Sequence, residues 1–253
     1  MSADTLPRPS PSPRAARVVT QARFEAGILL RNGEQVLVAL VLPALALVAL
    51  VAAPYPELND PRIAVVAPGV LALAIVSTAF TGQAIQTAFD RRYGVLRMLA
   101  TTPVGTDGLL LGKALAITVV ALLQVVLLGT LALALGWRPD PVGLLGVPVS
   151  TLLGVWVFVA LALLLAGSLR AEGVLAVANL VWVLLAGAGG LLLPHDTLGP
   201  AGAFVRWLPS GALGDAFREP LATGDIPVVP WLLLVGWGLV LSLGVVRTFR
   251  WRD

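Results

Sequence analysis

A phosphate-binding loop is the first chemistry to test for in this chain, because residues 108–114 read GLLLGKA. A nucleotide-binding P-loop has four residues between its two glycines and a serine or threonine after its lysine. Here three residues separate Gly108 from Gly112, and Ala114 follows Lys113. We therefore expect no nucleotide at this segment, and we interpret the glycines as small residues that let helices pack closely.

Polar side chains within apolar stretches are the next candidates for chemistry. Four of them follow the i, i+3, i+4, i+7 spacing of a single helical face: Gln83, Gln86, Thr87 and Asp90. They either line a cavity at the end of a helix or form hydrogen bonds that hold neighbouring helices together. Gln124 and Asn179, which lie in other apolar stretches, allow the same two interpretations. We favour packing and keep cavity lining as the alternative.

The sequence contains no motif that indicates an enzyme active site or a metal site. The chain has no cysteine and one histidine, His195, which excludes cysteine sites and histidine clusters. Neither an H-E-x-x-H nor a G-x-S-x-G motif occurs. The apolar stretches carry neutral polar groups instead of the charged residues that proton-driven carriers place there. We expect no bound cofactor or metal and no catalysis by this chain alone, and an external energy source for any transport.

The composition places the chain in a membrane. Of its 253 residues, 58% are hydrophobic and 12% are charged, whereas a soluble domain has about 25% charged residues. Six apolar runs approach the roughly 20 residues that cross a bilayer as a helix. We therefore predict an all-α integral membrane protein, with six transmembrane helices, an N-terminal amphipathic interfacial helix and a short cytoplasmic coupling helix.

The predicted organisation is a single membrane domain over residues 14–253, preceded by a disordered tail over residues 1–13 that is rich in Pro, Ser, Ala and Arg. The interfacial helix covers 14–32, and the spans cover 36–53, 63–89, 109–137, 142–169, 174–193 and 228–246. A coupling loop over 90–108 and an outer loop over 194–227 connect them, and the outer loop contains two short amphipathic pieces.

The interfacial helix is expected to lie flat in the membrane surface. At 100° per residue, Val18, Ala22 and Leu29 fall on an apolar arc. Gln21 and Glu25 fall on the polar side, together with several arginines. Such a helix places its polar side toward the lipid headgroups.

The basic residues predict the orientation. Thirteen of the seventeen arginines and lysines lie on the side that holds both termini and the coupling loop. The other side has four: Arg62, Arg138, Arg206 and Arg218. Because basic residues stay in the cytoplasm, we expect a multi-pass protein of the cell (inner or plasma) membrane with both termini cytoplasmic.

The coupling loop begins with a basic, partly apolar helix. We expect a helix from Asp90 to Leu99 that stops before Pro103, since the residue before a proline avoids helical geometry. Apolar residues between arginines suit docking onto a protein, with an apolar anchor and a charged rim. The expected anchors are Leu96 and Leu99, and the expected rim charges are Arg92 and Arg97. The alternative is an ordinary basic cytoplasmic loop.

This segment resembles the cytoplasmic loop of ABC exporter permeases of the second type, and the chain looks drug-exporter-like. The stretch DRRYGVLRMLATTPV matches the family pattern at Gly94, Leu96, Leu99, Thr102, Pro103 and Val104, and Gly112-Lys113 follows in place. Asp90 stands for the first acid of the pattern, whereas Arg92 stands where a second acid is common. The resemblance extends over nearly the whole chain, through the N-terminal helix, the six spans and the outer loop.

The resemblance implies a permease subunit that moves a lipophilic or amphiphilic substrate out of the cytoplasm. Its coupling helix would dock on a separate cytoplasmic ATPase, which binds ATP and Mg. The coupling residues would be Asp90, Arg92, Gly94, Leu96, Arg97, Leu99, Thr102 and Pro103. Two ATPases and two permeases form such complexes, and the second permease is a copy of this chain or a related one. No nucleic acid is expected. The alternatives are a haem- or cytochrome-assembly ABC permease, and a non-transporting membrane scaffold or channel.

Overall fold

The computed structural model describes residues 13–33, 37–53, 61–100 and 105–248, and these residues form helices and no strand. One long helical rod lies at the centre of the bundle. It consists of α4 (Arg62–Val76), a π-helical segment η2 (Ser77–Gly82) and α5 (Gln83–Arg92). It is the most buried of the candidate spans, and nearly every residue of α4 from Val66 onward is inaccessible to solvent. The all-α prediction is confirmed over the described residues.

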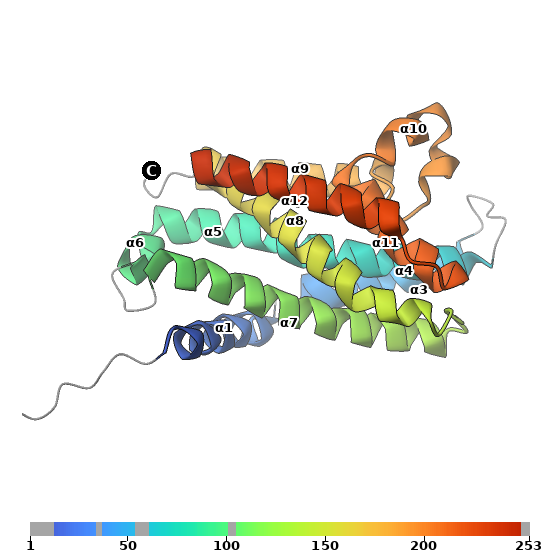
Figure 1. The fold of residues 1–253 in the computed structure, drawn as a ribbon, viewed down its shortest axis with the longest axis horizontal. Helices are drawn as coiled ribbons and strands as arrows, with labels where there is room; N and C mark the ends of the chain where they lie inside the picture. Colours follow the sequence, from blue (N-terminus) through green and yellow to red (C-terminus); the bar gives the residue numbers. More distant parts are fainter. Residues whose placement is uncertain (1–12, 34–36, 54–60, 101–104, 249–253) are drawn as a thin grey trace, which may run out of the picture.

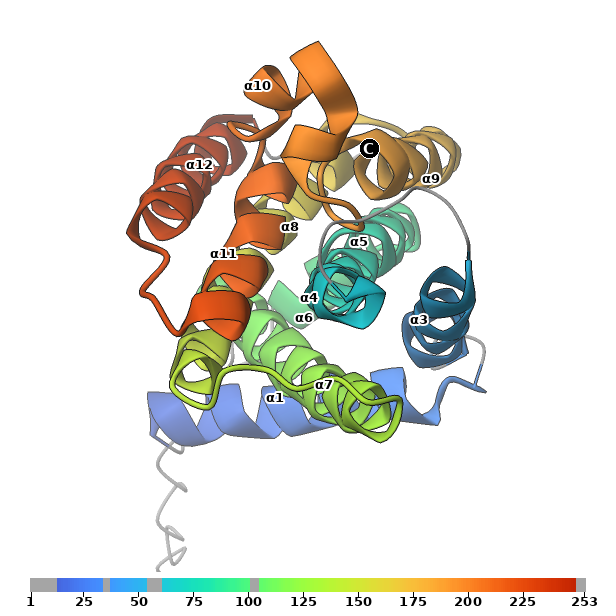
Figure 2. The ribbon, with the colours of Figure 1, turned by 90° about the vertical axis from the view of Figure 1, so that its right-hand side faces the viewer.

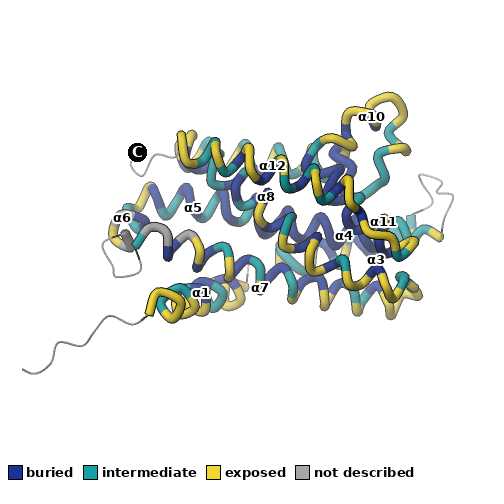
Figure 3. The backbone as a smooth tube through the Cα atoms, viewed as in Figure 1, coloured by how far each residue is buried: buried dark blue, intermediate teal, exposed yellow. Residues whose placement is uncertain are grey.

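Four further long helices run alongside this rod: α7 (Gly105–Ala134), α8 (Gly146–Ser168), α9 (Ala171–Ala188) and α12 (Val228–Thr248). The end-on view shows α4 and α5 in the middle, with α7, α8 and α9 around them and α12 beyond α8 (Figure 2). Exposed residues follow the outer surfaces of α7 and α12, whereas buried residues concentrate in α4 and the facing side of α8 (Figure 3). The core is therefore built on the second predicted span.

The number of spans is only partly settled by the described residues. Five helices are long and apolar enough to cross a membrane, and they correspond to the second to sixth predicted spans. The expected first span is represented by a π-helical turn η1 (Leu37–Val41) and α3 (Leu42–Ala52), and its apolar helix Ala39–Ala52 is shorter than the other five. A sixth crossing stays a prediction.

The expected outer loop contains a helix that enters the bundle. It forms a 3-10 segment η4 (His195–Ala201), α10 (Gly202–Val205) and α11 (Pro209–Thr223). The sequence predicted short amphipathic pieces here, yet Leu213, Ala216 and Phe217 of α11 are fully buried. They pack against α4, α8 and α12. The two predicted pieces correspond to α10 and α11, but the sequence did not indicate that α11 is buried; glycines along this helix, such as Gly211 and Gly214, let it pack closely within the bundle.

The N-terminal helix α1 (Arg14–Arg31) crosses the bundle instead of running along it (Figure 2). It packs on α7, where a Cβ atom on Gly112 would come within 2.7 Å of Gln21 Cγ. Its buried residues are Ala22, Glu25 and Leu29. The expectation that Glu25 faces lipid headgroups is wrong, because its carboxylate is turned inward toward a buried partner on α7.

Candidate functional site

The segment predicted to couple to an ATPase contains a short helix at the end of the central rod, at the same end of the bundle as α1 and the last turn of α12 (Figure 1). The rod ends at Arg92, and a separate helix, α6 (Val95–Ala100), follows. Gly94 joins them with a φ of 72°, a left-handed conformation that strongly favours glycine. The expectation of one continuous helix from Asp90 to Leu99 is therefore wrong, because Gly94 breaks it and turns α6.

The turn at Gly94 decides which side chains of the segment face outward. Leu96 is 3% exposed, so it packs against the chain itself and is not an open anchor as the sequence predicted. Tyr93 and Met98 are instead 71% and 63% exposed. Among the side chains of this segment that the structure describes, the exposed large apolar ones are Tyr93 and Met98. The side chains of Arg97 and Leu99, and residues Thr102 and Pro103, lie outside the described part of the chain.

Two arginines hold the end of α5 against the neighbouring helices. Arg91 Nη2 donates a hydrogen bond of 2.5 Å to the carbonyl oxygen of Leu169, at the turn between α8 and α9. Arg92 forms an ion pair with Glu172 in the first turn of α9. This pair is exposed, and exposed ion pairs contribute little to stability. The end of α5 therefore lies beside the turn between α8 and α9, and the buried Arg91 contacts that turn directly.

A buried ion cluster includes Asp90, the first residue of the predicted coupling loop. Lys113 Nζ on α7 is 3.2 Å from Glu25 Oε2 on α1 and 3.1 Å from Asp90 Oδ2 on α5. The side chains of Lys113 and Glu25 are each 6% exposed, and that of Asp90 is 23% exposed. Gln21 also donates a hydrogen bond of 3.0 Å to the other oxygen of Glu25. The sequence analysis named Asp90 but assigned Glu25 to the polar side of its helix because it is charged, although its spacing from Ala22 and Leu29 puts it on the same face as these two buried residues.

The predicted polar face of α5 is largely closed. Gln83 and Thr87 are 3% and 2% exposed. Gln83 Nε2 lies 3.4 Å from Gln86 Oε1 on the same helix, so this contact does not join two helices. Asn179 is exposed on α9, and its amide nitrogen bonds within the helix to Leu175. The structure therefore does not bring Asn179 together with the residues of α5.

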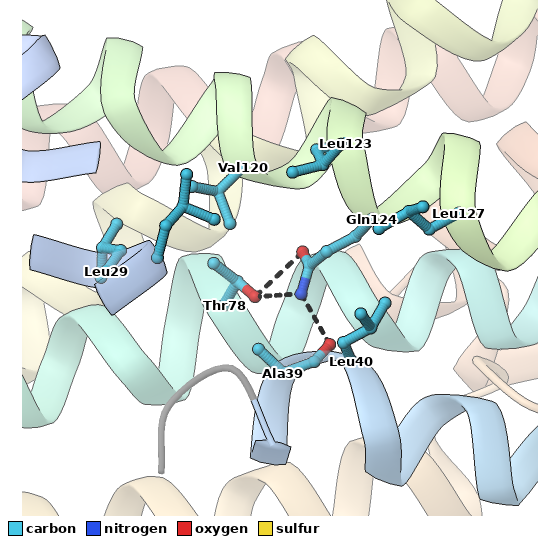
Figure 4. A pocket seen from close by; sticks show the side chains of 9 residues that line it. Leu29, Ala39, Leu40, Thr78, Val120, Leu123, Gln124 and Leu127 are labelled. Carbon is cyan, nitrogen blue, oxygen red and sulfur yellow. Dashed lines mark hydrogen bonds between the residues drawn. The ribbon is translucent and has the colours of Figure 1, made fainter. Parts of the chain in front are cut away.

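Gln124 has a different environment, between three helical segments. Its Nε2 atom donates a 2.6 Å hydrogen bond to the carbonyl oxygen of Ala39 in η1. Its amide also bonds to the hydroxyl of Thr78 in η2, with Thr78 Oγ1 donating to Oε1 at 3.0 Å (Figure 4). These bonds border an apolar cavity of about 50 Å³ that Leu29 and Val120 also line. Gln124 thus lines a small cavity and bonds neighbouring helices, so it fits both interpretations. Thr78 was missed by sequence reasoning.

A second hollow is larger and opens at the outer surface of the bundle. It is a groove of about 500 Å³ between α7, α8 and α12. Most of its lining is apolar. Trp156 also lines the groove, and its Nε1–H already donates a 3.1 Å hydrogen bond to Ser242 Oγ. The hydroxyl of Thr118 donates to Ala114 within α7. This groove is chemically suited to hydrocarbon.

The opposite end of the bundle holds a second set of charges, on α11. Asp215 lies 3.1 Å from His195 Nδ1 and 3.5 Å from Arg218 Nη1. Arg218 also donates hydrogen bonds to the carbonyl oxygens of Gly190 and Leu191, beyond the end of α9. Burial raises the pKa of Asp215 above its ordinary value, although Arg218 and His195 oppose the rise. Burial likewise lowers the pKa of Arg218 to about 10. Within the described ranges, no group of acids and histidine is arranged to hold a metal.

Comparison with known proteins identifies one family. A family model described as ABC-2 type transporter matches residues 18–219. The match covers most of α1, η1 and α3, the central rod, α6 to α9, and most of α11. No significant match to a curated protein was found.

Proposed function

Because the chain belongs to the ABC-2 type transporter family, we propose that it is the permease of an ATP-driven exporter that moves a lipophilic or amphiphilic substrate out of the cytoplasm. Membership makes it a multi-pass membrane subunit of a transporter, not an enzyme by itself, and implies an ABC ATPase as its partner. ATP and Mg would bind to that ATPase. Two copies of the ATPase and a second permease would complete the assembly.

The observation that carries this proposal is the coupling segment itself. Crossing a bilayer does not require a separate short helix at the end of a span. Here Gly94 turns the chain into such a helix, and Tyr93 and Met98 are exposed on this segment. The ring of Tyr93 stacks on the ring of Phe89, with the ring centroids 6.0 Å apart. The guanidinium group of Arg92 lies over the Tyr93 ring. An exposed aromatic and an exposed thioether side chain, with Arg92 beside the aromatic ring, form the type of surface that proteins use to bind each other.

The substrate class rests on the groove between α7, α8 and α12. Its lining is mostly apolar, and the indole N–H of Trp156 is already bonded to Ser242, so the groove offers few polar groups to a polar cargo. A hydrocarbon chain or a flat lipophilic molecule suits this surface. The proposed orientation places α6, α1 and the end of α12 on the cytoplasmic side, which is the basic side of the sequence.

Substitution of Met98 tests the docking surface. We expect Met98→Asp to weaken ATPase binding by about 2 kcal/mol, or roughly thirtyfold, because it removes an exposed apolar contact and introduces a charge. The matched control is Phe204→Asp, which changes a residue of similar exposure, 69%, at the other end of the bundle. The measurement is the amount of ATPase that copurifies with the inserted permease in mild detergent.

Leu96→Asp is the less informative variant, because it would bury a charge in the permease and disturb the fold. The proposal is contradicted if Met98→Asp inserts normally and retains as much ATPase as the native chain. It is also contradicted if Phe204→Asp causes the same loss, since the effect would then not belong to the coupling segment.

A further inference from the structure

The chain's only lysine lies where three helices meet. Lys113 belongs to α7, Glu25 to α1 and Asp90 to α5, and the three side chains form the buried cluster described above. Asp90 lies one helical turn before Gly94, where the coupling helix α6 begins. The cluster therefore connects the segment that would meet the ATPase with a helix that lies across the bundle.

Burial makes this connection difficult to break. A charge removed from water costs several kcal/mol unless an opposite charge is held against it. One ammonium group here is held by two carboxylates, so separating Glu25 from it would leave the buried Glu25 carboxylate without this cation, while Lys113 would keep Asp90. Close packing adds to the constraint, since α1 lies directly on Gly112, the residue before Lys113.

We propose that Lys113 is a positioning residue that ties α1 to α5, so that a displacement of α6 by the ATPase moves α1 as well. The inference rests on the proposed function, because it assumes that the ATPase acts on α6. It adds that the movement of α6 is passed on to α1 as well as to the central rod. The positive charge and the length of the Lys113 side chain make this transmission possible.

The tie itself can be measured in the isolated permease, without any ATPase. Since the chain has a single lysine, an amine-reactive reagent followed by mass spectrometry reports the accessibility of one side chain besides the N-terminal amine. Glu25→Gln and Asp90→Asn each remove one charged partner, and we expect each to speed labelling of Lys113 by about tenfold or more. Glu172→Gln removes an exposed acid from the Arg92 pair and serves as the matched control.

Equal labelling of Lys113 in the native chain and in both variants would overturn the tie. A thermal unfolding curve of each variant shows whether faster labelling comes from local opening or from loss of the whole fold. Faster labelling in the Glu172→Gln control would also overturn it, because the effect would then not be specific to the cluster.

The transmission requires the complex with the ATPase. The absence of cysteine allows spin labels at two introduced cysteines, Arg23→Cys on α1 and Phe204→Cys on α10, both exposed positions. We expect the distance between the labels to change when ATP binds and hydrolysis is blocked. Lys113→Arg should retain the distance change, since arginine keeps the positive charge, whereas Lys113→Met should abolish the distance change. Asp90→Asn leaves the Lys113–Glu25 pair intact and should reduce the distance change. It replaces Lys113→Met as the test variant if Lys113→Met does not fold.

These outcomes separate the inference from the function on which it rests. If no ATPase copurifies with the native chain, the proposed function fails. If the ATPase copurifies and Lys113→Met shows the same nucleotide-dependent distance change as the native chain, the function stands and the role of Lys113 is contradicted. If the native chain itself shows no change at α1, the tie does not transmit the movement.

Discussion

Charged residues at the two ends of the bundle are held in different ways. At the end with α6, Lys113 is shared by Glu25 and Asp90. At the other end, Arg218 joins Asp215 to the backbone beyond α9, so that a charged side chain closes the gap left by the end of a helix. Both arrangements satisfy buried charges with several partners, which is the condition for tolerating them.

The acid range of pH tests the environment of Asp215. Because burial raises its pKa in the folded state, its contribution to stability is fully present below its ordinary pKa and is lost as the pH rises through the raised value. We therefore expect Asp215→Asn to flatten this part of the stability profile. The measurement is thermal unfolding by tryptophan fluorescence in detergent, from about pH 4 to pH 7. Both proteins carry His195→Gln, so that the imidazole does not titrate.

An unchanged slope after Asp215→Asn would show that Asp215 ionises as freely in the folded protein as in the unfolded chain. A slope that becomes steeper would contradict the sign of the shift. A lower overall stability of the variant does not by itself test the pKa shift, since Asp215→Asn also removes the charge that faces Arg218. The slope is therefore the quantity to compare.

At the scale of elements, glycines decide where helices approach and where they turn. Gly94 turns the chain into α6, and Gly112 admits α1. Gly69, in the interior of α4, lies against the backbone that follows α9, where a Cβ atom would come within 2.6 Å of the Leu191 carbonyl oxygen. Backbone atoms cannot move aside as a flexible side chain does, so this contact fixes α4 against the Leu191 segment.

Substitution at Gly69 tests that contact. We expect Gly69→Ala to destabilise the protein by about 1–3 kcal/mol, because the added methyl group overlaps backbone. Gly236→Ala in α12 is the matched control, since a Cβ atom there meets nothing within 4 Å, and alanine favours helix over glycine. The midpoint of thermal unfolding in detergent is the measurement. Equal midpoints for the two variants would contradict the packing of α4 against the Leu191 segment.

The sequence predicted the long apolar elements well, because a run of about 20 apolar residues has few alternatives in a membrane. The second predicted span, residues 63–89, corresponds to the rod Arg62–Arg92, and the last, 228–246, to Val228–Thr248. Helix α11 was missed as a buried element, because it is short and contains Asp215 and Arg218. Periodicity also gave no signal for the π-helical segments η1 and η2.

The candidate site was predictable in position but not in detail. The basic segment after the second span, with its glycine and its apolar residues, was visible in the sequence. Which leucine or methionine is exposed depends on the turn at Gly94, and this reverses the expectation for Leu96. The burial of Glu25 depends on Lys113, 88 residues away, and a local pattern does not contain such a contact.

At the scale of the whole molecule, α6, α1 and the end of α12 lie at one end, and α10 lies at the other (Figure 1). The groove between α7, α8 and α12 lies along the side of the bundle. Under the proposed function, this division separates a surface for a cytoplasmic partner from a surface in contact with lipid. A permease energised by a separate ATPase needs both, and it needs the end that meets the ATPase to be connected to the spans.

A photo-cross-linking amino acid at position 98, introduced in living cells, tests this account most directly. The same amino acid at position 204 is the control, because Met98 and Phe204 are similarly exposed at opposite ends of the bundle. After capture of the permease, mass spectrometry identifies what is attached at each position. The account predicts a P-loop ATPase at position 98 and not at position 204. Position 98 without an ATPase, or an ATPase attached at position 204, would contradict it.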